Sequence, residues 1–276
     1  MRPERTPFVA AHLNSVPATP VEGRSVNEAR YAHLASALAM VDIGHCQKTD
    51  RAPPLFLEFG VRDGRSITYL SSLSSGRQWH GFDSFQGLPG MSNAANATEL
   101  SARQRIGWGR GRYTRKGEMP SVPKGVTLHK GWFNETLPLF LDGPSAESVS
   151  RSTAYKLPPA VAFAHMDADL YESTYEVLYQ LATRCRLCAG TVLAFDELFG
   201  SPTVELQEWR ALRRAARCFD FGFEFITYMA HPKTAFGRAA VRLTRVGPCV
   251  PSPARGYSGS TSAEAAAARC RADADV

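Results

Sequence analysis

Acidic side chains follow two apolar runs of the sequence, where strands are expected to end. Asp167 comes after AVAFAHM (160–166), and Asp196 and Glu197 come after GTVLAF (190–195). Because neighbouring parallel strands bring their carboxyl ends to one edge of a sheet, we expect these three carboxylates to meet there. Clustered carboxylates repel one another unless a cation neutralises them, and oxygen ligands suit Mg²⁺ or Mn²⁺. The pattern favours a metal site over structural hydrogen bonding.

Other polar residues near this edge have competing explanations. Asp169-Leu170-Tyr171-Glu172 has the form of a capping box, so Asp169 is expected to begin a helix. His165 precedes the acids and is expected to be a hydrogen-bonded core histidine. His129 and His231 are expected beside the mouth of the sheet and are candidates for a general base, with a bystander role as the alternative.

A glycine turn and a strand-end acid stand earlier in the chain. Gly60 and Gly64 follow the run LFLEFGV (55–61) and would let the backbone approach a ligand at the start of the next helix. Asp83 follows QWHGF (78–82), roughly 20 residues beyond the glycine turn, where an acid can accept hydrogen bonds from ribose hydroxyls. The pair indicates an adenosine-containing cofactor without saying which one.

Strands and helices must alternate to place these residues at one edge. Strands are expected at 55–61, 78–82, 126–130, 160–166 and 190–195, and helices at 25–44, 66–73 and 173–186. This alternation predicts an α/β fold with a parallel sheet and helices on both faces. The last two apolar runs, 223–229 and 237–246, face each other across a short loop and predict a C-terminal antiparallel hairpin.

Composition bounds the organisation of the chain. Its 276 residues, 44% of them hydrophobic, suit one globular domain or at most two. We expect a flexible leader at 1–24, a catalytic domain at 25–247 and a disordered tail at 248–276. No apolar run is long enough for a membrane span or a signal peptide, which predicts a cytoplasmic protein without membrane association. A homo-oligomer is left open.

The cysteines bear on disulfide bonding, and the basic residues bear on possible partners. Six scattered cysteines make a disulfide framework unexpected, and Cys185 and Cys188 are expected to be plain thiols one helical turn apart. The net charge is 32 − 26 = +6, and six cations without an acid lie in the segment 101–116. This basic loop suits an anionic ligand or RNA, or is a solvated surface loop. Nucleic acid is not the expected partner, because charge elsewhere is balanced.

Five motifs occur in an order and spacing typical of one enzyme family. They are LEFGV (57–61) with Gly64 and Ser66, GFDSFQGLP (81–89), KGWF (130–133) with TLP (136–138), DADLYEST (167–174) and FDE (195–197). From about Pro54 to Val246 the chain thereby resembles the class I S-adenosylmethionine (SAM) dependent methyltransferases of the macrocin O-methyltransferase type.

The resemblance implies a Rossmann-like sheet of seven mostly parallel strands with a SAM pocket at the first two strand ends. It places the metal ligands at Asp167, Asp196 and Glu197. The chain departs from the family pattern at Arg62, where many members have glycine, and at Glu197, which replaces an aspartate. The cofactor-binding residues that it implies are Glu58, Gly60, Gly64, Ser66, Asp83, Ser84, Gly131, Trp132 and Asp167.

The predicted function is therefore a metal-assisted O-methyltransferase that acts on a hydroxyl of a small molecule of the sugar or natural-product type. Asp167, His129 or His231 would accept the hydroxyl proton. One alternative is a nicotinamide-dependent Rossmann oxidoreductase, which gives no role to the three carboxylates. Another is a non-catalytic RNA-binding module that uses 101–116. We also expect the segment 91–124 to close over the acceptor through Arg110, Arg112 and Arg115.

Overall fold

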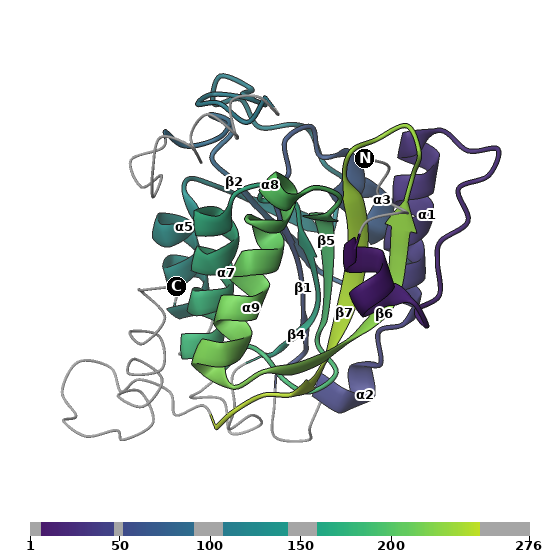
Figure 1. The fold of residues 1–276 in the computed structure, drawn as a ribbon. Coiled ribbons are helices and arrows are strands. Elements are labelled where there is room, and N and C mark those ends of the chain that lie inside the picture. Colours follow the sequence, from purple (N-terminus) through teal and green to yellow (C-terminus); the bar gives the residue numbers. More distant parts are fainter. Residues whose placement is uncertain (1–6, 47–51, 91–106, 143–158, 249–276) are drawn as a thin grey trace.

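A seven-stranded sheet forms the centre of the molecule in a computed structural model, which describes residues 7–46, 52–90, 107–142 and 159–248 (Figure 1). The strand order is β3-β2-β1-β4-β5-β7-β6, and only β7 runs antiparallel to its neighbours. The strands are β1 (Leu55–Phe59), β2 (Trp79–Asp83), β3 (Val126–Lys130), β4 (Val161–Met166), β5 (Val192–Phe199), β6 (Gly222–Ala230) and β7 (Gly237–Arg245).

Helices cover both faces of this sheet (Figure 1). One layer holds α1 (Val26–Ala39) and α3 (Arg65–Leu73), and the other holds α5 (Phe133–Asp142), α7 (Tyr171–Thr183) and α9 (Glu208–Phe219). Shorter elements are a π-helical turn, η2 (Val9–Leu13), and the helices α2 (Ile43–Cys46) and α8 (Pro202–Glu205). The α/β fold, the two helical layers and the C-terminal hairpin are confirmed.

The central strands are apolar because both of their faces are covered. All residues of β4 and β5 are buried, which explains why the two runs show no alternation of apolar and polar residues. Strand β5 extends beyond its predicted end and includes Asp196 and Glu197. Both acids lie between Phe195 and Phe199, where the pairing of β5 with β7 shifts register.

The N-terminal segment differs from the flexible leader that the sequence predicts. Phe8 and Leu13 are buried, and the Phe8 ring stacks on Phe199 with 5.1 Å between centroids. Further along, the backbone N–H of Thr19 donates to the carbonyl of Tyr228 in the edge strand β6 at 2.7 Å. Residues 8–19 thus pack on β5 and cover the edge of the sheet, which reduces its exposed backbone.

The plain-thiol prediction is wrong. Cys185 lies in the turn after α7 rather than in the helix, and Cys185, Cys188 and Cys218 are disulfide-bonded. Spacing in sequence does not show which sulfurs meet in the fold. Because disulfides are rare in cytosolic proteins, the cytoplasmic location stays a prediction. Within the described part of the chain, no helix has the length and apolar character needed to cross a bilayer.

Candidate functional site

A cavity of about 590 Å³ opens at the carboxyl ends of the parallel strands. It is lined by residues that follow β1, β2, β3 and β4, by residues of β5 and β7, and by Asn27 and Arg30 from α1. This is the edge at which α/β sheets bind ligands. Eight of the predicted site residues line it: Gly60, Ser84, Gly131, Trp132, Asp83, Asp167, Asp196 and Glu197.

The turn after β1 is built around Gly60 and Asp83. Gly60 has φ +90°, and a Cβ there would lie 1.8 Å from the carbonyl oxygen of Asp167, so glycine is required where β1 and β4 converge. The carboxylate of Asp83 accepts the backbone N–H of Arg62 at 2.7 Å and that of Phe85 at 2.6 Å. Each oxygen keeps a lone pair, so Asp83 is held in place with acceptor capacity left for a ligand.

Glu58, Gly64 and Ser66 do not line the cavity, so the direct cofactor contact expected for them stays a prediction. Glu58 is fully buried, and its two oxygens accept from the Ser66 hydroxyl and lie beside Nδ1 of His165, each at 3.0 Å. The Cα of Gly64 faces Pro120 and Val122 instead. The apolar run placed Glu58 on the strand correctly, but alternation along the strand turns its side chain into the core.

Neither candidate histidine base lines the cavity, so the structure gives no support for either assignment. His129 stacks on Phe82 with 4.5 Å between ring centroids, and its Nε2 lies 3.1 Å from Nδ1 of His80. His231 is buried, with Nε2 3.1 Å from the carbonyl oxygen of Arg24. Of the three predicted bases, only Asp167 is placed at the site.

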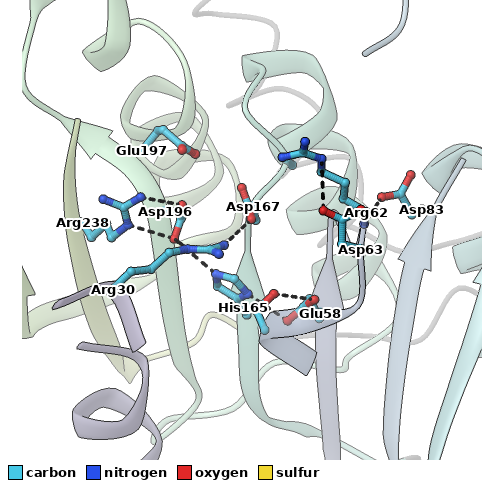
Figure 2. Close-up of polar contacts among 12 residues, drawn as sticks. Arg30, Glu58, Arg62, Asp63, Asp83, His165, Asp167, Asp196, Glu197 and Arg238 are labelled. Atoms are coloured by element: carbon cyan, nitrogen blue, oxygen red, sulfur yellow. Dashed lines mark hydrogen bonds and ion pairs between the residues drawn. The ribbon is translucent and has the colours of Figure 1, made fainter. Parts of the chain in front are cut away.

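Two arginines neutralise the acid pair at the centre of the mouth (Figure 2). From α1, Arg30 donates to Asp167 at 2.5 Å and to Asp196 at 2.7 Å. Arg238 on β7 donates to both oxygens of Asp196, each at 3.0 Å. Burial opposes ionisation of Asp196, but Arg238 and Arg30 outweigh it and hold the pKa of this carboxyl well below its usual range.

Two arginines occupy Asp196 in this structure, although His165, Asp167 and Asp196 offer ligand atoms within 4.8 Å of one another, so its role as a metal ligand stays a prediction. Both of its oxygens already accept from guanidinium groups, and a dication in the same place would lie against two fixed positive charges. The clustered carboxylates do have positive charge beside them, and arginine side chains supply that charge. The chain position of Arg30, 166 residues before Asp196, gave no local signal.

A second group of acids consists of Asp167, which is paired with Arg30, and two acids that pair with no arginine in the described part of the chain. One oxygen each of Asp167, Asp169 and Glu197 lie within 4.8 Å of one another, and Oε2 of Glu197 is buried without a hydrogen-bond partner. Burial first, and then neighbouring carboxylates, raise the pKa of Asp169 and of Glu197 well above the usual range. Burial and Asp196 raise the pKa of Asp167 to about 6. Three close hard oxygens with unfavourable charge are a donor set that fits Mg²⁺ or Mn²⁺.

Asp169 is the site residue that the sequence analysis missed. Its capping-box interpretation is wrong, because the N-cap of α7 is Leu170 and no side chain caps the helix there. Asp169 has φ 58°, a strained conformation for a residue with a Cβ, and its carboxylate lies in the cavity wall. The available signal was the Asp-Ala-Asp spacing directly after a buried strand.

His165 lies between Glu58 and Asp196 of the acid pair (Figure 2). It is fully buried, with Nδ1 3.0 Å from Glu58 and Nε2 3.6 Å from Asp196. Burial lowers the pKa of His165, but the bonds to Asp196 and Glu58 outweigh it and raise the pKa to about 9. The expected core histidine is thus a buried cation between two carboxylates.

The described part of the segment 91–124, residues 107–124, is packed against the domain. Trp108 is buried and stacks on Phe236, and Arg115 donates to Asp63 at 2.8 Å. Tyr113 lines the cavity, with the guanidinium groups of Arg62 and Arg112 beside its ring. Trp108 and Arg115 are therefore anchors rather than parts of a closing lid. Residues 91–106, which include Arg103 and Arg105 of the basic segment 101–116, lie outside the described residues.

Comparison with known proteins gives structural likeness only. No protein-family model matches the chain, and no curated protein matches it. Solved structures that it is similar to include the O-methyltransferase NovP (21% identity, 78% of this chain and 80% of that chain, TM-score 0.49). Another is CalS11, a TDP-rhamnose 3'-O-methyltransferase of calicheamicin biosynthesis (22%, 85% and 85%, TM-score 0.46). A third is Aeropyrum pernix fibrillarin in complex with SAM (13%, 75% and 73%, TM-score 0.36).

Proposed function

We propose that the protein is a SAM-dependent O-methyltransferase that acts on a hydroxyl of a small molecule. The observation that carries this proposal is the charge of the cavity beside Asp83: eight acidic side chains line it against three arginines. An acidic cavity favours a cationic cofactor, and SAM carries a sulfonium and an ammonium group. The anchored carboxylate of Asp83 supplies the acceptor that a ribose diol needs at this strand end.

The same charge distribution argues against the two alternatives. A nicotinamide dinucleotide brings a pyrophosphate, and RNA brings a phosphate backbone, and both would be repelled by the acids around the cavity. The described cations of the basic loop include Arg115, which is paired with Asp63. An O-methyltransferase is therefore the function that the site supports best.

The cofactor assignment predicts that Asp83→Ala weakens SAM binding by about 1.5–3 kcal/mol, because hydrogen bonds to a charged acceptor are lost. Titration calorimetry measures this directly, with NAD⁺ as the competing ligand. Asp63→Ala is the matched control, since Asp63 is in the same turn but does not line the cavity. Equal affinity of wild type and Asp83→Ala for SAM, or tighter binding of NAD⁺, would remove the assignment.

We place the proposed divalent cation on Asp167, Asp169 and Glu197. Such a cation would act as a Lewis acid that lowers the pKa of the acceptor hydroxyl. Asp167 would accept the hydroxyl proton, since it lines the cavity and belongs both to this acid group and to the pair held by Arg30. Arg30 and Arg238 keep Asp196 ionised and fixed, and the strand ends orient the acceptor toward the methyl group.

Metal binding gives a separate prediction. Mn²⁺ should bind the wild-type protein, and Glu197→Gln should weaken that binding by about tenfold or more, because an anionic ligand becomes a neutral amide. Electron paramagnetic resonance of Mn²⁺ titrated onto the protein measures both affinities. Glu172→Gln is the control, because Glu172 lines the cavity outside the group of three acids. If Mn²⁺ binds both variants as it binds the wild type, the metal assignment is wrong.

A further inference from the structure

Glu208, the first residue of α9, contacts both strand ends that carry the acids. Its side chain is fully buried. Oε1 accepts the backbone N–H of Ala168 at 3.3 Å, and Oε2 accepts the backbone N–H of Glu197 at 3.0 Å. One carboxylate therefore joins the segment after β4 to the end of β5, although it comes from a helix and does not itself line the cavity.

The two N–H groups are placed where they control the acids of the site. Ala168 stands between Asp167 and Asp169, and Glu197 is itself one of the three acids. A shift of either backbone segment would move at least one of these carboxylates. Because the donors belong to the main chain, the contact fixes backbone position rather than one side-chain rotamer.

A carboxylate is the side chain that this arrangement requires. Both of its oxygens accept, whereas the amide of glutamine would turn an NH₂ donor toward one of the two N–H groups. The neighbouring Gln207 accepts with Oε1 from the backbone N–H of Tyr171, at the start of α7. The beginning of α9 thus contacts three backbone positions around the acids, and each contact is made by a buried side chain.

Burial of a further acid beside three others is electrostatically unfavourable, because desolvation and like charges both oppose it. Hydrophobic side chains could fill the space beneath the strand ends at lower cost. The hydrogen bonds offset part of the cost, and what they secure is the geometry of the strand ends. In metal sites, residues that do not touch the metal often hold its ligands in place through hydrogen bonds in the same way.

We infer that Glu208 is a positioning residue, which sets the spacing of Asp167, Asp169 and Glu197 by holding the N–H groups of Ala168 and Glu197. The inference rests on the metal-binding part of the proposed function. It adds a residue from α9 that touches neither cofactor nor acceptor but determines whether the three carboxylates can share one cation.

The experiment compares wild type, Glu208→Gln and Glu208→Asp by two measurements. Amide hydrogen exchange followed by NMR reports on the N–H groups of Ala168 and Glu197, and Mn²⁺ titration reports on the acids. In Glu208→Gln we expect faster exchange at one or both amides and an Mn²⁺ affinity lower by about tenfold or more. SAM affinity should be unchanged, because Asp83 and Gly60 are not in contact with Glu208. Glu208→Asp keeps both acceptor oxygens on a shorter stem and should give a smaller effect.

Glu224→Gln is the matched control, because it removes a carboxylate that pairs with Arg242 on the exposed edge of the sheet. It should change neither measurement. Unaltered exchange at Ala168 and Glu197 in Glu208→Gln would overturn the inference, even if the variant were less stable. Wild-type binding of Mn²⁺ that survives in Glu208→Gln would also overturn it, while leaving the proposed function in place. Failure of the wild type itself to bind Mn²⁺ would remove the proposed metal site, and failure to bind SAM would remove the proposed cofactor.

Discussion

Replacement of Arg238 by methionine is expected to lower the free energy of unfolding by about 3–5 kcal/mol, the usual cost of leaving a buried charge without its partner. Asp196 is 3% exposed and accepts two hydrogen bonds from Arg238. Methionine fills similar space but donates nothing, so Asp196 would retain only Arg30 and His165 as cationic neighbours. Urea unfolding near neutral pH measures the loss.

Arg242→Met is the matched control, because it makes the same change on the same strand. Arg242 pairs with Glu224 at the surface, where ion pairs contribute about 1 kcal/mol or less. A second variant, Arg238→Met combined with Asp196→Leu, should recover part of the lost stability because no charge is left unpaired at Asp196. Equal destabilisation by Arg238→Met and Arg242→Met would show that the buried pair contributes no more to the free energy of unfolding than the surface pair does.

The second large effect is a pH dependence that comes from His165. The pKa of His165 is raised from 6.5 to about 9 in the folded protein. A raised pKa means that the folded state holds the proton more tightly, so the stabilisation is complete below pH 6.5 and is lost as pH rises through about 9. At about 1.4 kcal/mol for each pH unit, this stabilisation is about 3 kcal/mol.

The measurement is the difference in unfolding free energy between wild type and His165→Gln as a function of pH. That difference should be constant below pH 6.5 and should shrink between 6.5 and 9. His165 also lowers the pKa of Asp167 and of Asp196, so the difference includes the response of these two acids to the loss of the imidazolium. His80→Gln serves as the control, because burial lowers the pKa of His80 to about 4 and its contribution changes below pH 6.5 instead. If the difference in unfolding free energy between wild type and His165→Gln stays constant up to pH 9, the raised pKa of His165 is wrong.

Several features of the fold were accessible from sequence because they depend on local chemistry. The buried runs at β4 and β5 marked strands, since strands covered on both faces must be apolar along their whole length. The capping box at Ser25 and Glu28 forms as predicted, because its atoms lie within one helical turn. Helix α9 was not predicted, although its buried residues Trp209, Leu212 and Ala215 recur at helical spacing.

The candidate site was predicted to the level of its location. A strand fixes where its last residue lies, so Asp83 and Asp167 could be placed at the mouth of the sheet from the runs before them. The sequence did not show which side chains turn into the cavity. Glu58 and His129 are both on predicted strands, yet Glu58 turns into the core and His129 packs between aromatic rings.

The sequence by itself thus determined the succession of strands along the chain and the edge at which acids gather. Only the tertiary structure decided that Arg30, 137 residues before Asp167, neutralises the pair in the place where a metal was expected. The same holds for Asp169, whose left-handed backbone aims its carboxylate at Glu197, and for Glu208, which reaches both strand ends from α9. The physical reason is that local patterns encode contacts within a few residues, whereas the neutralisation of a buried charge depends on whichever group folding brings within hydrogen-bond distance.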